Sequence, residues 1–226
     1  MKAYIRISRF DHWFKNIFVL PGFFISMILI ESDEPSFGMW LNLLIGLIAI
    51  GFIASANYTI NEYLDSDSDK YHPVKKNRPG VKGQLNRNYV FLQYIAYLVI
   101  GISISLTIHV RFTLILIIFM IMGLLYNVPP IRTKDKPYLD VLSESLNNPI
   151  RLFAGWVLVS PAYFPPSSLL LSYWFGGAFL MAVKRFSEYN SIVQTPEKLY
   201  KVKSFLLYCL IIVIIIFGLF YYDINS

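Results

Sequence analysis

Three side chains that carry oxygen donors recur at intervals of four residues in the stretch NEYLDSDSDKYHPVKKNRP. They are Asn61, Asp65 and Asp69. In a helix this spacing places all three on one face. Oxygen-bearing groups gathered there repel each other unless a cation lies among them, and oxygen ligands beside a membrane suit Mg²⁺, which proteins usually share with substrate phosphates. The spacing therefore predicts a Mg²⁺ site made by Asn61, Asp65 and Asp69.

Basic side chains follow these oxygen donors directly. His72, Lys75 and Arg78 are able to contact phosphate oxygens that the metal does not cover. A solvated loop beside a membrane helix would carry similar charges, and charge alone favours that simpler interpretation. The regular spacing and the abrupt junction with an apolar segment favour a phosphate-binding site instead.

The composition indicates the elements that must position these residues. Only 15% of the 226 residues are charged and 56% are hydrophobic, whereas soluble domains are about 25% charged. Apolar runs of about 20 residues predict membrane helices. We therefore expect one all-α integral membrane domain over residues 1–226, without a removable signal peptide and, with Cys209 as its one cysteine, without a disulfide framework. Seven spans are expected, at residues 16–30, 39–60, 89–109, 112–126, 139–160, 167–182 and 205–222.

The distribution of Lys and Arg predicts the orientation. With seven spans, the basic groups before the first span and after the second, fourth and sixth all fall on one side, and Arg111 is the single Lys or Arg in the loops of the other side. The positive-inside rule makes the basic side cytoplasmic. This predicts a plasma (inner) membrane protein with a cytoplasmic N-terminus and site. The net charge of +6 reflects these loops rather than an affinity for nucleic acid.

The same stretch resembles the first signature of the UbiA superfamily of membrane prenyltransferases. That signature usually begins Asn-Asp, and Glu62 stands here in place of the second residue. The resemblance implies a UbiA-like helical bundle. It also implies that Asn61, Asp65 and Asp69 bind a Mg²⁺–diphosphate substrate, with Asp65 and Asp69 catalytic, and that Lys75 and Arg78 contact phosphate.

A second segment, MAVKRFSEYN, stands where most of the superfamily has a second aspartate-rich motif. Its polar residues are Lys184, Arg185 and Glu188, so two cations replace expected carboxylates. Lys and Arg hold phosphate without a metal, although snorkelling at a helix end would also explain them. The segment resembles the decaprenyl-phosphate phosphoribosyltransferase branch, in which the lipid is the acceptor.

Two more segments agree with that branch. SRFDHWFKNIFVLPG resembles its N-terminal motif and implies that Lys15 meets a lipid phosphate, although interfacial anchoring would also account for it. YNVPPIRTKDKPYLDV and the later NNPIRLFAG imply substrate-binding roles for Tyr126, Lys134, Asp140 and Arg151, while the Pro-Pro pair departs from the branch. An unpaired arginine in a membrane helix costs at least about 2.5–3.5 kcal/mol, so Arg151 should face the bundle and have a partner there.

The expected function is Mg²⁺-dependent transfer of 5-phosphoribosyl from phosphoribosyl diphosphate to a polyprenyl phosphate. A prenyltransferase that uses an isoprenyl diphosphate donor is the nearest alternative, and it predicts a second carboxylate cluster. A transporter or non-catalytic scaffold is another. UbiA proteins usually have nine helices, so either a partner protein or a second copy of the chain would supply the remaining two, or the lateral opening of the bundle would be wider.

Overall fold

Helices make up all of the secondary structure in the part of the chain that the structure describes. The computed structural model describes residues 2–30, 36–70, 75–136 and 138–192, together with Leu207, residues 210–216, Gly218 and Tyr221. The elements are α1 (Lys2–Ile7), η1 (Phe10–Val19, a 3₁₀ helix), α2 (Leu20–Leu29), α3 (Phe37–Leu64), α4 (Ser66–Asp69), η2 (Lys75–Asn77), α5 (Arg87–Leu106), α6 (Val110–Asn127), η3 (Thr133–Asp135), α7 (Leu139–Ser145), α8 (Asn147–Val159) and α9 (Ser167–Ile192).

Local capping fixes where several helices begin. Ser36 accepts a hydrogen bond from the Met39 amide at the start of α3, and Asn86 accepts one from the Asn88 amide at the start of α5. His109 does the same for α6 through its ring nitrogen. These side chains satisfy amides that the first helical turn leaves without partners.

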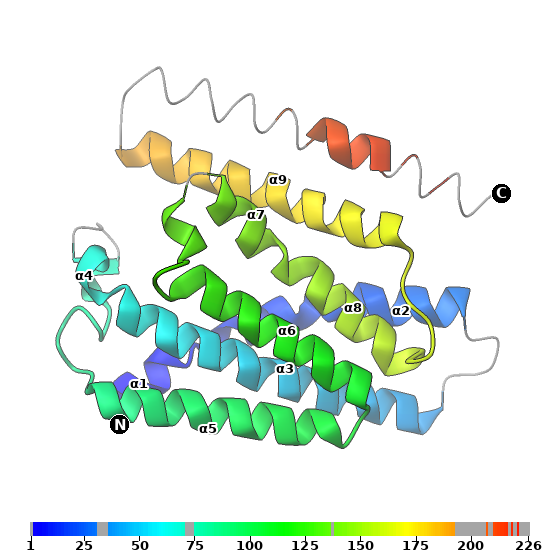
Figure 1. The fold of residues 1–226 in the computed structure, drawn as a ribbon, viewed down its shortest axis with the longest axis horizontal. Coiled ribbons are helices and arrows are strands. Elements are labelled where there is room, and N and C mark those ends of the chain that lie inside the picture. Colours follow the sequence, from blue (N-terminus) through cyan, green and yellow to red (C-terminus); the bar gives the residue numbers. More distant parts are fainter. Residues whose placement is uncertain are drawn as a thin grey trace.

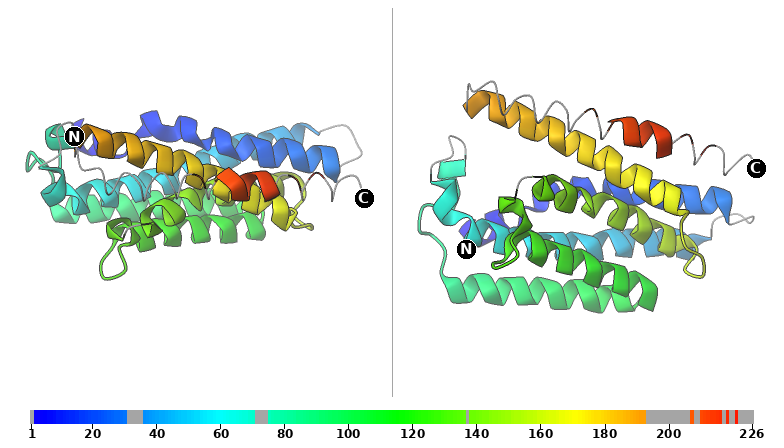
Figure 2. Two further views of the ribbon diagram at one scale, coloured as in Figure 1. Left: turned by 90° about the horizontal axis from the view of Figure 1, so that it is seen from above. Right: turned by 45° about the horizontal axis from the view of Figure 1, so that its top comes forward.

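The helices form an elongated bundle (Figures 1 and 2). α3 packs along α5, α2 packs along α8, and α9 lies against α7 and α8. The largest core cluster lies where α2, α3, α6 and α8 meet, and its buried members include Phe23, Ile53, Leu116 and Val157. Lipid is as apolar as these side chains, so close packing is expected to hold the helices together.

The closest packing is between α2 and α8. A Cβ at Gly22 would overlap the carbonyl oxygen of Leu152, and a Cβ at Gly155 would overlap that of Val19. The two backbones therefore touch directly, as small residues allow in membrane bundles. This crossing fixes α8, and with it Arg151, against the N-terminal segment.

Four stretches of the described residues are long and apolar enough to cross a membrane: Lys2–Leu29, Phe37–Leu64, Arg87–Leu106 and Val110–Asn127. The predicted total of seven spans stays a prediction. The predicted span at 139–160 is not one helix, because α7 ends at Ser145 and α8 begins at Asn147. In the predicted seventh span, the positions that the structure describes are helical.

Most of the polar segments singled out in the sequence lie at one end of the bundle. The end of α3, α4, the beginnings of α5 and α7, and the ends of α6 and α9 are all on the left in Figure 1. The fold thus brings the two predicted polar clusters, which are more than 100 residues apart in sequence, to the same end of the molecule.

Candidate active site

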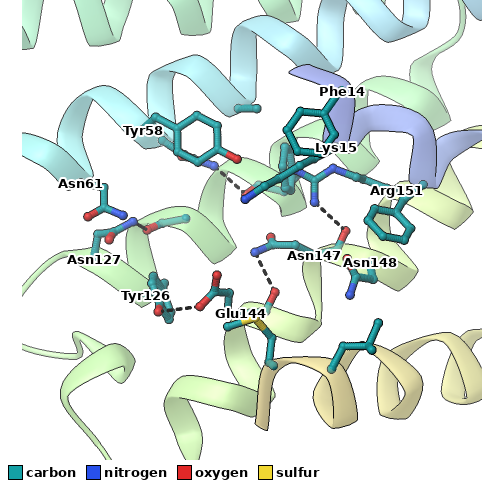
Figure 3. Close-up of a pocket in the computed structure, with 18 residues that line it drawn as sticks. Phe14, Lys15, Tyr58, Asn61, Tyr126, Asn127, Glu144, Asn147, Asn148 and Arg151 are labelled. Atoms are coloured by element: carbon teal, nitrogen blue, oxygen red, sulfur yellow. Dashed lines mark hydrogen bonds between the residues drawn. The ribbon is translucent and has the colours of Figure 1, made fainter. Parts of the chain in front are cut away.

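A cavity of about 320 Å³ opens between η1, α3, α6, α7, α8 and α9. Its wall combines aromatic rings with many amide side chains (Figure 3). The polar residues that line it are Lys15, Asn57, Tyr58, Asn61, Tyr126, Asn127, Glu144, Asn147, Asn148 and Arg151. Four of these, Lys15, Asn61, Tyr126 and Arg151, were predicted from the sequence as site residues.

Two cations line this cavity. Arg151 is 7% exposed, its guanidinium carbon lies 4.6 Å from the centre of the Phe119 ring, and its Nε donates to Asn16 Oδ1 at 3.3 Å. Lys15 Nζ lies 6.0 Å from the centre of the Tyr58 ring. Within the described residues neither cation forms an ion pair with a carboxylate. Both positive charges are therefore available to an anion that enters the cavity.

The N-terminal segment is docked firmly enough to position Lys15. Trp13 donates from its indole nitrogen to Ser55 Oγ at 2.9 Å, and Arg9 pairs with the buried Glu62 at 3.5 Å. Glu62, the residue that departs from the family signature, thus ties the segment to α3 rather than facing the cavity.

The first motif keeps its helical register across the junction of two helices. α3 ends at Leu64, yet the Asp65 amide donates to the Asn61 carbonyl at 2.9 Å and the Asp69 amide donates to the Asp65 carbonyl at 2.8 Å. The predicted spacing of Asn61, Asp65 and Asp69 along one helical track is therefore present. Of the three, Asn61 lines the cavity.

Cations hold both carboxylates of this motif. Arg132 contacts Asp65 at 2.9 Å, and Lys134 also donates to Asp65. Arg78 contacts Asp69 at 2.5 Å, and Lys75 lies 4.0 Å from it. Burial lowers the pKa of Lys134, while its hydrogen bond to Asp65 acts in the opposite direction. Lys75, Arg78 and Lys134 were predicted to bind substrate, and the fold places all three beside the acidic residues.

The acidic motif has the donor set for a divalent ion, although the described residues contain no group of three His, Cys, Asp or Glu side chains that could hold one. The additional ligand would be an amide, because Asn61 Oδ1 is buried and no described residue donates a hydrogen bond to it. An orphaned oxygen in register with two carboxylates fits an oxygen-coordinated cation such as Mg²⁺.

The second polar cluster is the segment with Lys184, Arg185 and Glu188, and nearby carboxylates partly neutralise the charge of its Arg185. Arg185 donates from Nε to Asp140 at 3.0 Å and from a terminal nitrogen to the Tyr126 hydroxyl at 3.2 Å, and it lies 3.6 Å from Glu144. Lys184 is exposed on α9. Glu188 belongs to α9, but its side chain lies outside the described residues, as does His72 entirely.

Residues that line the cavity contact both clusters. Lys134 Nζ, which holds Asp65, donates to Asn127 Oδ1 at 3.2 Å. On the other side, Tyr126 donates to Glu144 at 2.9 Å, and both residues contact Arg185. A ligand in the cavity would therefore lie near both clusters, each of which combines carboxylates with cations.

Sequence reasoning missed several residues of the site. Arg132 contacts Asp65 from a loop 67 residues away, and Glu144 lines the cavity beside Tyr126. Asp140 and Arg151, both predicted to bind substrate, contact different elements, since Asp140 pairs with α9 and Arg151 faces η1 and α6. An acid such as Glu144 inside a predicted span was a signal that could have been used.

The chain resembles several curated proteins over part of their length. It is 26% identical over 207 residues to the decaprenyl-phosphate phosphoribosyltransferase of Corynebacterium glutamicum, covering 87% of this chain and 58% of that protein. An uncharacterized protein of Sinorhizobium fredii, y4nM, is 28% identical over 165 residues, which are 73% of this chain and 30% of the other. A protoheme IX farnesyltransferase of Vibrio parahaemolyticus is 28% identical over 105 residues, 46% of this chain and 34% of that enzyme. The chain thus spans between 30% and 58% of the length of these relatives.

Solved structures share the fold. A UbiA homologue of Archaeoglobus fulgidus, solved with GPP and Mg²⁺, superposes with a TM-score of 0.77 at 23% identity, over 96% of this chain and 76% of the other. A structure described as bearing on digeranylgeranylglyceryl phosphate synthase gives 0.70 at 19% identity, over 97% and 77%. The apolar helices and this fold make the chain a multi-pass membrane protein. The sequence profile of the UbiA prenyltransferase family matches residues 18–225, which confirms the predicted family. The chain belongs to the UbiA prenyltransferase family of transferases.

Proposed function

We propose that the protein transfers a 5-phosphoribosyl group from phosphoribosyl diphosphate to a polyprenyl phosphate in a Mg²⁺-dependent reaction. The observation that carries this proposal is the pair of cations, Lys15 and Arg151, that line the cavity without a carboxylate partner in the described part of the chain. A phosphate on the acceptor would satisfy both. The phosphoribosyltransferases among the relatives point the same way.

The position of Arg185 supports a donor that needs no second metal site. Family members that bind an isoprenyl diphosphate donor are expected to hold it with a second carboxylate cluster, on the helix that corresponds to α9. Here Lys184 and Arg185 occupy that position. Asp140 and Glu144 lie beside Arg185, and both are close enough to pair with it rather than standing free as metal ligands.

Asn61, Asp65 and Asp69 would hold the ion. A bound divalent cation supplies Lewis-acid stabilisation of the negative charge on the leaving diphosphate. Three cations already contact the two carboxylates: Arg78, Arg132 and Lys134. They would therefore lie beside a diphosphate that is bound through the metal ion. These side chains therefore orient the donor and neutralise its charge, which is the larger part of catalysis in such a transfer.

The transfer itself exchanges one bond for another at the anomeric carbon. The bond to diphosphate breaks and its electron pair leaves with the diphosphate, while an oxygen of the polyprenyl phosphate forms the new bond. By analogy with glycosyl transfer, the sugar carbon carries positive charge in the transition state. The acceptor is already an anion, so the chain needs no strong base. Lys15 and Arg151 would hold this phosphate in position.

The experiment is a test of donor and acceptor together. Membranes that contain the protein are incubated with Mg²⁺, a polyprenyl phosphate and labelled phosphoribosyl diphosphate, and in parallel with labelled isoprenyl diphosphate and an aromatic acceptor. We expect label in lipid from the sugar donor and at least a 100-fold loss in Asp65→Ala. Label from isoprenyl diphosphate alone would show a prenyltransferase. The absence of transfer from either donor would favour a transporter or scaffold.

A further inference from the structure

Three asparagines that line the cavity each have a side-chain oxygen for which the described residues supply no hydrogen-bond donor. Oδ1 of Asn57, Asn61 and Asn147 are all buried and unpartnered, and all three residues line the cavity. Leaving a buried acceptor without a donor costs about 1–3 kcal/mol. The Asn61 oxygen is accounted for by the metal ion proposed above, and the other two indicate that a ligand with hydrogen-bond donors belongs in the cavity.

The local structure keeps the oxygen ends of two of these amides available. Asn57 Nδ2 donates to the Phe119 carbonyl at 3.3 Å, and Asn147 Nδ2 donates to the Glu144 carbonyl at 3.0 Å. Gly123 makes room for Asn57, because a Cβ there would overlap the amide. With the nitrogen ends held by the backbone, the oxygen ends remain to accept hydrogen bonds.

A carboxylate completes this group. Glu144 is the one acid among the residues described as lining the cavity, and its Oε2 accepts from Tyr126. No hydrogen bond from the described residues reaches its Oε1. In Figure 3 the side chains of Asn147 and Glu144 lie next to each other, and Asn61 lies farther away beside Asn127. A carboxylate beside amide oxygens forms a cluster of acceptors, which calls for donors.

We infer that Asn57, Asn147 and Glu144 form a hydroxyl-binding subsite that accepts hydrogen bonds from the sugar of the diphosphate donor. This inference rests on the proposed function, whose donor is a sugar diphosphate. A hydrocarbon chain in the same place would leave the acceptors unpaired, whereas sugar hydroxyls donate to them. Sites built to bind a hydroxyl discriminate strongly against ligands that lack it. The subsite thus selects a sugar donor over an isoprenyl donor.

The test measures binding with four probes: phosphoribosyl diphosphate, UDP-glucose, geranyl diphosphate and inorganic diphosphate. Each is titrated by calorimetry, with Mg²⁺, into purified full-length chain in lipid nanodiscs. The variants are Asn57→Ala, Asn147→Ala and Glu144→Gln, with Asn88→Ala as control, because Asn88 is an exposed asparagine at the start of α5. Melting temperatures identify any variant that does not fold, and the remaining variants then carry the test.

We expect Asn57→Ala and Asn147→Ala each to weaken phosphoribosyl diphosphate about 10-fold and to leave inorganic diphosphate unchanged. Glu144→Gln should lose less, since an amide oxygen still accepts. An equal loss for both probes would mean that these oxygens hold the metal ion, and the inference would be wrong.

The inference and the proposed function can fail separately. If every variant bound phosphoribosyl diphosphate as tightly as the wild type, the inferred subsite would be wrong and the proposed function would still stand. If the wild type did not bind phosphoribosyl diphosphate but the variants bound UDP-glucose more weakly than the wild type, the subsite would be supported and the proposed donor would be wrong. If geranyl diphosphate were the single probe that bound more tightly than inorganic diphosphate, both the subsite and the proposed function would be wrong.

Discussion

The guanidinium of Arg151 is the buried charge in this site that most needs a ligand. It contacts an amide oxygen, a backbone carbonyl and the face of the Phe119 ring, and within the described residues it has no carboxylate. A cation that is desolvated and lacks an anion is costly, and removing such charges is often neutral or stabilising. The residue is therefore expected to serve binding at the expense of stability.

Replacing this residue tests that trade-off. Arg151→Met should leave the melting temperature unchanged or raise it, because a side chain of similar length fills the space without a charge. The same change should reduce kcat/KM for polyprenyl phosphate at least 10-fold, because KM for this acceptor rises. The control is Arg87→Met, since Arg87 also lies over an aromatic ring, that of Phe91, but outside the cavity. A large drop in melting temperature with the acceptor KM intact would show a structural role.

How far single residues are predictable depends on the range of their contacts. The spacing of Asn61, Asp65 and Asp69 is a local property of a helix, and the register that it implies is present. The pairing of Asp65 with Arg132, and of Asp140 with Arg185, joins residues far apart in sequence. Such pairs depend on how loops fold back, which neither spacing nor composition encodes.

At the scale of elements, the contact between α2 and α8 decides how the N-terminal segment meets the cavity. Gly155→Ala should lower the melting temperature in detergent by several degrees, because the added methyl group has no space beside the Val19 carbonyl. Gly176→Ala in α9 is the matched control. No atom lies within 4 Å of a Cβ at that position, and alanine has the higher helix propensity. Similar melting temperatures for the two variants would contradict the close crossing.

The helices themselves were predicted better than their interruptions. Long apolar runs locate α3, α5 and α6, because membrane length and hydrophobicity set them. The break at Leu146 between α7 and α8, and the 3₁₀ geometry of η1, have no such signal. Both interruptions border the cavity, so irregular backbone occurs where it faces polar space rather than lipid, as is expected in membrane proteins.

For the whole molecule, the functional consequence of the fold is that the end of α3 and α4, which carry the acidic motif, lie at the same end of the bundle as the end of α9, to which Arg185 belongs (Figure 1). The described parts of the basic segments between α4 and α5 and between α6 and α7 are also at this end. A water-soluble sugar diphosphate is made in the cytoplasm, so the proposed function requires this end to be cytoplasmic. The positive-inside rule predicts the same orientation from loop charge alone.

Labelling of single cysteines tests that orientation. Asn77 in η2 and Thr107 just after α5 are both exposed, and the 20 residues of α5 between them span about 30 Å, the thickness of the apolar core of a bilayer. In a Cys209→Ser background, a maleimide that does not cross the inner membrane should label Thr107→Cys in intact bacterial cells. It should label Asn77→Cys after the cells are opened. The reverse pattern would place the acidic motif outside, away from a cytoplasmic donor, and labelling of both in intact cells would mean that α5 does not span the membrane.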